Sequence, residues 1–216
     1  MIDNYNSLPL GKFMELQELD FTSMEEIDIQ VSIISILNDM TEEEVLELPI
    51  TDYQRLASLT RFLASKPTHN NKIPKKIKLD GKEYIVINDI KQMTAGQYID
   101  YQNYISQKDE KLLPYILSCF IIPKGEKYGD SDINVVVENI KQHLSVTTAL
   151  SLSAFFLKKW ENLTRSTLTY LALKMKMEMW KEKNPQTKKM LKEAIQKITT
   201  LRNSIKDGVF SVGQYK

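Results

Sequence analysis

The sequence is strongly polarised in charge, and this polarity is laid over patterns that favour helix at both ends of the chain. Residues 1–50 contain twelve carboxylates and a single cation, Lys12. Residues 158–206 contain thirteen cations and four carboxylates, although the whole chain has a formal net charge of only +1. A chain with this distribution can pair its ends internally, stack on copies of itself, or offer its basic end to an acidic partner.

The composition is that of a globular protein with one core and room for a helical appendage: 216 residues, 42% of them hydrophobic. The single cysteine, Cys119, excludes a disulfide within the chain, and its apolar neighbours predict a buried, inert thiol. The longest apolar run, residues 149–157, stops at Lys158 and is too short to span a membrane. The first residues lack the pattern of a secretion signal, so we expect synthesis in a cytoplasm.

Three helices are predicted in the acidic N-terminal region. Ser23, with Glu26 three residues later, has the spacing of a capping box and predicts a helix that continues to about Asn38. The pair Thr41 and Glu44 predicts a second, short helix by the same signal. A third is expected to begin near Thr51 and to end near residue 67.

The middle of the chain combines one β-hairpin with further helices. Alternating apolar residues on both sides of an Asp-Gly pair predict a tight hairpin at about residues 77–87. Apolar periodicity then predicts helices from about residue 94, over residues 112–122, and over residues 130–143.

The C-terminal part is predicted to be almost entirely helical. Ser145 can cap a helix whose stretch 149–157 is apolar nearly all round, as in the middle of a core. Residues 158–206 form a long helical pattern that is broken once, at Asn184 and Pro185. We expect one apolar face before the break and one after it, formed by Leu168, Leu171, Met175 and Trp180 and by Met190, Leu191, Ile195, Ile198 and Leu201. In residues 207–216, apolar and small residues alternate, a pattern with which this segment could add a strand to a partner's sheet.

These elements predict a mainly α fold: a helical domain with one small β-hairpin, at about residues 77–87, and an extended C-terminal helical hairpin. The expected organisation has three parts. Residues 1–66 form an acidic helical subdomain, residues 75–160 a helical core that includes the β-hairpin, and residues 161–216 a basic helical hairpin and tail.

No pattern in the sequence indicates catalysis. His69 and His143 lack companions at metal-ligand spacing, and no nucleophile motif or phosphate-binding loop occurs. The acidic run 42–44 is typical of a solvated helix start, and the loop 124–132 lacks the ligand order of a calcium loop. We therefore expect a protein that is not an enzyme, with no catalytic residues, cofactor or metal.

Lysines alternate with methionines where the C-terminal hairpin turns, and this pattern favours an interaction surface. Methionine adapts to irregular partners, so packing against another protein is preferred over a solvated helix, a nucleic-acid contact or a membrane contact, in that order. The candidate interface comprises Lys174, Lys176, Met177, Trp180, Lys181, Lys188 and Lys189.

Four segments, residues 78–84, 93–100, 117–128 and 144–157, carry a resemblance in their hydrophobic and turn patterns. They resemble small proteins encoded among the virion and tail-assembly genes of tailed bacteriophages, most of all those of crAss-like phages of gut Bacteroides. The resemblance covers about residues 75–170 and leaves out the acidic helices and most of the basic hairpin. It implies a non-enzymatic protein of the virion or its assembly, made in the bacterial cytoplasm.

Within that class we expect a portal- or tail-associated structural protein, or a capsid cargo protein delivered with the genome. Its partners would be other phage structural proteins and copies of itself. One alternative is a tail-assembly chaperone, which would be absent from the mature virion. Another is a nucleic-acid-binding packaging factor that contacts DNA through Lys181, Lys183, Lys188 and Lys189.

Overall fold

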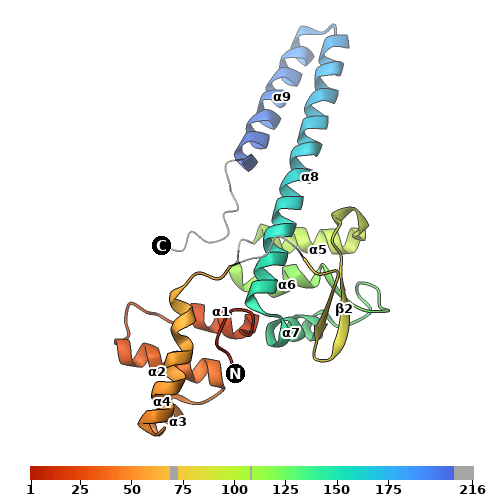
Figure 1. Cartoon of the computed structure of the whole chain (residues 1–216). Helices are drawn as coiled ribbons and strands as arrows, with labels where there is room; N and C mark the ends of the chain where they lie inside the picture. Colours follow the sequence, from red (N-terminus) through yellow and green to blue (C-terminus); the bar gives the residue numbers. More distant parts are fainter. Residues whose placement is uncertain (69–72, 108, 207–216) are drawn as a thin grey trace. The chain divides into compact units, whose positions relative to one another are not determined.

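A computed structural model describes residues 1–68, 73–107 and 109–206. For residues 160, 161, 163 and 204–206 it describes the backbone alone. The chain divides into two compact units, Met1–Ser153 and Ala154–Lys216 (Figure 1). The expected acidic subdomain and the β-hairpin both belong to the first unit. His69 and the predicted strand-forming tail, residues 207–216, lie outside the described residues.

The acidic region contains four helices: the three that the sequence predicts and one unpredicted helix before them. They are α1 (Leu10–Glu18), α2 (Glu26–Asn38), α3 (Glu42–Leu46) and α4 (Ile50–Leu59), the last continued by a 3-10 turn, Thr60–Ala64.

The three predicted helix starts in this region have different outcomes. The capping box at α3 is confirmed: Thr41 Oγ1 accepts the Glu44 N–H at 3.2 Å, and Glu44 Oε2 accepts the Thr41 N–H at 2.7 Å. The predicted box at Ser23 is wrong, because α2 begins after Glu25 without a side-chain cap. The Ser23 hydroxyl instead points to the Asp20 carbonyl in the preceding turn. Similarly, α4 follows Pro49 directly and has no side-chain cap.

The predicted β-hairpin is present and acquires a third strand. β1 (Lys76–Leu79) and β2 (Lys82–Val86) are antiparallel, and Asp80 and Gly81 in the turn have φ angles of 47° and 72°, as a tight hairpin turn requires. β3 (Ile121–Pro123) pairs with the other side of β2.

β3 corrects the prediction of one helix over residues 112–122. That helix, α6 (Leu113–Ser118), stops four residues before the predicted end, and the β-branched pair Ile121 and Ile122 lies opposite Val86 and Ile85. Pro123, which has no N–H to donate, takes a place on an edge strand.

Three helices accompany the sheet in the first unit: α5 (Ala95–Ser106), α6 and α7 (Ile133–His143), with 3-10 turns at Ile90–Gln92 and Glu110–Leu112. α6 packs against both α5 and α7 (Figure 1). A second capping box, between Thr94 and Gln97, starts α5 as predicted. Gln97 is buried, and its Nε2 donates to the Cys119 carbonyl at 3.0 Å, which ties α5 to the chain after α6.

The N-terminal segment is held by backbone pairing to a part of the chain far along the sequence. The Leu10 N–H donates to the Leu144 carbonyl at 2.8 Å, and the Val146 N–H donates to the Leu8 carbonyl at 2.9 Å. Leu8 and Val146 are fully buried and share a core cluster with Leu16 and Leu37. A second cluster, made of Val31, Ile34, Val45 and Leu56, holds α2, α3 and α4 together.

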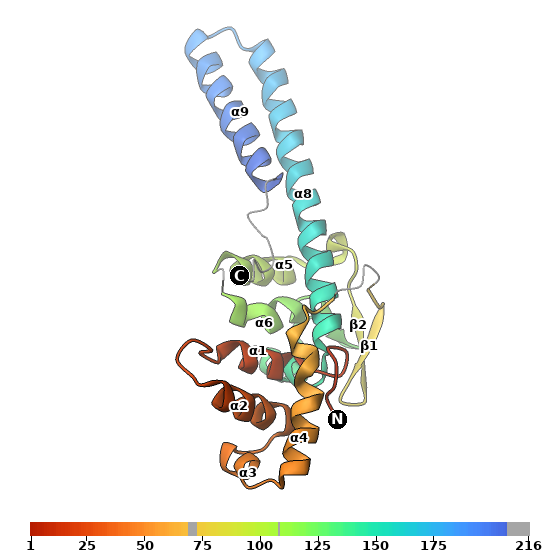
Figure 2. The same cartoon turned by 60° about the vertical axis from the view of Figure 1, so that its left-hand side comes forward.

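The second unit is built from two long helices, α8 (Val146–Lys181) and α9 (Pro185–Lys206). The first eight residues of α8, Val146–Ser153, belong to the first unit. α9 runs back along α8 in both views (Figure 1, Figure 2). The predicted mainly α fold with a small β-hairpin and a C-terminal helical hairpin is therefore confirmed. Ser145 Oγ accepts the Thr148 N–H at 3.3 Å, as expected for a residue that caps the start of α8.

Candidate interaction surface on the C-terminal helical hairpin

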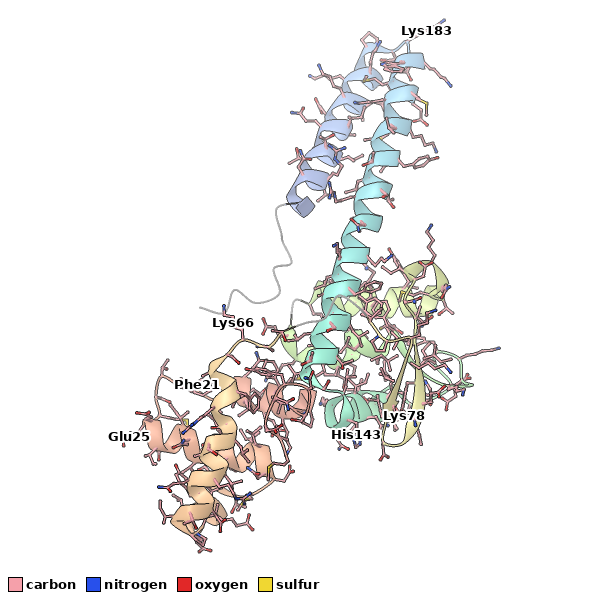
Figure 3. The ribbon with its side chains drawn as sticks, viewed as in Figure 1. Phe21, Glu25, Lys66, Lys78, His143 and Lys183 are labelled. Carbon is pink, nitrogen blue, oxygen red and sulfur yellow. The ribbon has the colours of Figure 1, made fainter. Side chains whose placement is uncertain are left out.

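The turn between α8 and α9 is fixed by two polar side chains. Glu182 Oε1 accepts the backbone N–H groups of Lys183 and Asn184, both at 2.8 Å. Asn184 Oδ1 accepts the Gln186 N–H at 2.8 Å and so caps α9, which begins at Pro185. Asparagine at the cap followed by proline in the first turn is a strong helix start, and the predicted break is confirmed. Lys183 lies at the tip of the hairpin (Figure 3).

The seam between the two helices is thin. We assign it to partly buried positions that recur at alternating spacings of three and four: Leu168, Ala172, Met175 and Met179 on α8, and Leu191, Ile195, Ile198 and the charged Arg202 on α9. Between residues 157 and 203, no side chain that the structure describes is fully buried. The described part of the hairpin therefore has no fully buried core of its own.

A second row of large side chains on α8 lies outside the seam. Tyr170, Leu173, Met177 and Trp180 are 66%, 55%, 52% and 75% exposed. Their spacing of three, four and three residues places them along one side of a helix that turns 100° per residue, far around α8 from the seam. We call these four residues the apolar stripe.

The predicted apolar faces of the hairpin are therefore partly wrong. Leu168 and Met175 do lie at the seam, but Trp180, five residues after Met175, turns to the opposite side of α8 and is exposed. Leu171, at 41% exposed, also lies off the seam. On α9, Leu191, Ile195 and Ile198 contribute to the seam, whereas Met190 and Leu201 are 68% and 54% exposed.

Lysines flank the apolar stripe on both sides. The helical repeat places Lys174 and Lys181 along one edge of the stripe and Lys176 along the other. All three are exposed, and none of the hairpin lysines whose side chains the structure describes forms an ion pair. Their charge is therefore available to a partner.

The structure brings five of the seven predicted interface residues together on α8: Lys174, Lys176, Met177, Trp180 and Lys181. The other two, Lys188 and Lys189, are exposed in the first turn of α9 near the tip. Sequence reasoning missed Tyr170 and Leu173. The spacing of 170, 173, 177 and 180 was the signal that could have found them, because it repeats an apolar position on a face that the seam does not use.

An open groove adjoins the stripe. It has a volume of about 720 Å³, and Tyr170 and Leu173 belong both to its lining and to the stripe. The rest of its lining is polar, with Asn162, Arg165, Ser166 and Thr169 from α8 and Arg202 and Asn203 from α9. A partner seated on the stripe therefore finds hydrogen-bonding groups at the end of the stripe farther from the tip.

The first unit contains a smaller pocket, of about 350 Å³, at the loop between β3 and α7. Tyr128 and Asp100 belong to its lining, and the Tyr128 hydroxyl donates a hydrogen bond to Asp100 Oδ2 at 2.8 Å. Cys119 Sγ lies behind it, 3.9 Å from the Tyr128 oxygen. Burial raises the pKa of the Cys119 thiol to about 12, so the thiol stays protonated near neutral pH. The expectation of a buried cysteine is confirmed.

Among the residues that the structure describes, no three His, Cys, Asp or Glu side chains gather as metal ligands. His143 ends α7 and is exposed. In the loop 124–132, the carboxylates accept backbone hydrogen bonds: Asp130 from the Lys127 N–H at 2.8 Å and Asp132 from the Asn134 N–H at 2.9 Å. These bonds shape the loop and the start of α7.

Within the described part of the chain, none of the helices combines the length and the apolar character that a membrane crossing requires. Comparisons with protein-family models, with curated proteins and with solved structures found no match for this sequence.

Proposed function

We propose that this chain is a non-enzymatic assembly protein that binds other proteins through the apolar stripe and its flanking lysines. The observation that carries the proposal is the exposure of Tyr170, Leu173, Met177 and Trp180 in one row. Single exposed apolar residues are common on protein surfaces, whereas a row of four with two aromatic rings is typical of interfaces. Tryptophan and tyrosine are also enriched among the residues that contribute most to binding.

The particular role that we propose is that of a minor component of a tailed-phage virion: a portal- or tail-associated structural protein, or a cargo protein of the capsid. The sequence resemblance of residues 78–84, 93–100, 117–128 and 144–157 supports this assignment. The helical make-up supports it as well, since a thin two-helix arm with an uncovered stripe can be completed by a neighbouring subunit.

Mass spectrometry of purified phage particles tests the role. Peptides of the chain should be found in particles purified by density gradient, at a copy number that stays constant between preparations. Detection in infected cells but not in the particles would contradict the role and would favour the tail-assembly chaperone.

A nucleic-acid-binding packaging factor is the second candidate, and the lysines at the tip of the hairpin favour it. Lys181, Lys183, Lys188 and Lys189 are exposed and have no ion-pair partners among the described residues. This candidate predicts DNA binding that weakens steeply with salt, because each phosphate contact releases counterions. Replacing the four lysines by glutamine should then lower the salt slope by about four units. DNA binding with no salt dependence, or none at all, would exclude it.

A further inference from the structure

The apolar stripe is flanked by basic residues, and its length suits contact with one helix of a partner. From Tyr170 to Trp180 it extends about 15 Å, at a rise of about 1.5 Å per residue. Lys174 and Lys181 flank one edge and Lys176 the other. A partner that suits it must offer apolar side chains along a similar length, with carboxylates on either side.

The first unit offers a surface of the opposite charge. The one cation of residues 1–50, Lys12, pairs with Asp39, and Lys111 pairs with Glu18. The other ten carboxylates of residues 1–50, all of them described, have no ion-pair partner. This segment therefore keeps a large negative charge.

The same acidic segment exposes apolar side chains among its carboxylates. Ile27 on α2, Leu46 on α3 and Ile50 on α4 are 53%, 68% and 66% exposed. Glu26 and Asp28 adjoin Ile27 in sequence, and Glu43 and Glu47 lie three residues before and directly after Leu46. Figure 3 shows Glu25 just before α2 and Phe21, itself 50% exposed, in the preceding loop. By the acidic face we mean the exposed carboxylates and apolar side chains of α2, α3 and α4 taken together.

We propose that the apolar stripe of one copy of this chain docks on the acidic face of a second copy. This inference rests on the proposed function, because it names the partner of the same surface. The charges decide between the possible pairings: two hairpins would bring lysines against lysines, and two acidic faces would bring carboxylates together. Only the pairing of stripe with acidic face is favourable in both charge and apolar contact.

A contact of this kind is head-to-tail, since each copy carries both halves at different places. Such contacts repeat from copy to copy until a ring closes, or continue as a filament when the rotation does not close. The assembly grows with protein concentration. It also weakens with salt, because the flanking charges are exposed and screened over about 8 Å at physiological ionic strength.

Two variants of the full chain test the pairing. The stripe variant carries Lys174→Gln, Trp180→Ser and Lys181→Gln, and the acidic-face variant carries Glu43→Gln, Leu46→Ser and Glu47→Gln. A control, Lys78→Gln, Lys82→Gln and Ile99→Ser, removes two exposed lysines and an exposed apolar side chain elsewhere in the first unit. All nine side chains are exposed, so circular dichroism should show that each variant folds as the wild type does.

Analytical ultracentrifugation of each protein and of mixtures gives the answer. We expect wild type and control to self-associate, and each triple variant to do so at least tenfold more weakly. An equimolar mixture of the two variants should form a species of twice the 25.1 kDa chain mass that does not grow further, because one good contact survives. A mixture that stays monomeric, or an acidic-face variant that associates like wild type, would overturn the pairing.

The test separates this inference from the proposed function. A wild-type chain that is monomeric at all concentrations, yet present in purified particles, refutes the self-pairing and leaves the assembly role standing. Binding of the full wild-type chain to duplex DNA without self-association would overturn the self-pairing in favour of a nucleic-acid partner. Self-association in the expected pattern by a chain absent from particles would instead refute the virion role alone.

Discussion

Lys12 and Asp39 form an ion pair in which Nζ and Oδ2 are 2.6 Å apart, and this pair uses the only cation of residues 1–50. Lys12 also donates to the Leu37 carbonyl at 3.0 Å, so it satisfies the C-terminal end of α2 as well. The pair joins α1 to α2. Glu18 pairs with Lys111 from outside the segment, and the other ten carboxylates have no ion-pair partner among the described residues.

Replacing Lys12 by methionine should lower the free energy of unfolding by about 1 kcal/mol, because it removes the ion pair and the bond to the Leu37 carbonyl. Urea denaturation measures the change. The matched control is Lys66→Met, labelled in Figure 3. Lys66 is exposed and has no ion-pair partner among the described residues, so this change should alter stability by less than about 0.5 kcal/mol. Equal effects of the two substitutions would contradict a stabilising role for the pair.

Gly11 lies in α1 where that helix meets α7. A Cβ at this position would approach the Lys141 carbonyl oxygen to 3.1 Å and the Lys141 Cβ to 3.2 Å. Gly11→Ala should therefore destabilise the protein by about 1–3 kcal/mol, since both helices would have to move apart. In contrast, Gly96→Ala in the first turn of α5 meets nothing closer than 4.0 Å and should stabilise it by up to about 1 kcal/mol. Thermal unfolding would refute the contact if both alanines raised the midpoint.

Glu83 on β2 pairs with two lysines: its Oε1 lies 2.9 Å from Nζ of Lys76 on β1 and 3.0 Å from Nζ of Lys124, which directly follows β3. The ammonium groups of Lys76 and Lys124 hold the pKa of this carboxyl below its ordinary value of 4.5. A lowered pKa gives stability that is fully present above 4.5 and is lost as the pH falls through the lowered value.

The difference in melting temperature between wild type and Glu83→Gln should therefore be constant from pH 7 to about pH 5 and should shrink as the pH falls below 4.5. Scanning calorimetry across this range measures it. A difference that grows toward acid pH would mean that the carboxylate is not stabilised by its lysines.

The two predicted capping boxes of the acidic segment provide a direct comparison. Thr41→Ala removes the hydroxyl that accepts the Glu44 N–H and should cost about 1 kcal/mol. Ser23→Ala should cost less than about 0.5 kcal/mol, because Ser23 lies two residues before the cap position of α2. Chemical denaturation of both variants distinguishes them, and a larger loss for Ser23→Ala would contradict the observed helix start.

The sequence predicted those parts of the fold that local signals decide. The Asp80–Gly81 turn, the capping residues Thr41 and Thr94, and the break at Pro185 each act within a few residues of chain. The third strand was missed because Ile121 and Ile122 form it only by pairing with β2, more than thirty residues earlier. Without that pairing partner in view, the apolar pattern of these residues is typical of the end of a helix.

The candidate site was predicted in part for a related reason. Lysine and methionine alternation pointed to Lys174, Lys176, Met177 and Lys181, and these lie together on α8. Trp180 was found but assigned to the wrong face, since the seam was inferred from residue type and not from the angle around the helix. Which side α9 covers depends on the turn at Glu182 and Asn184, and that choice defines the uncovered stripe.

The mass of the wild-type chain in solution at low and high salt, measured by light scattering over a range of concentrations, tests the central claim most directly. Docking of the apolar stripe on the acidic face of another copy predicts a mass above 25.1 kDa that rises with concentration at low salt and returns to 25.1 kDa at high salt. A mass of 25.1 kDa under every condition would contradict it.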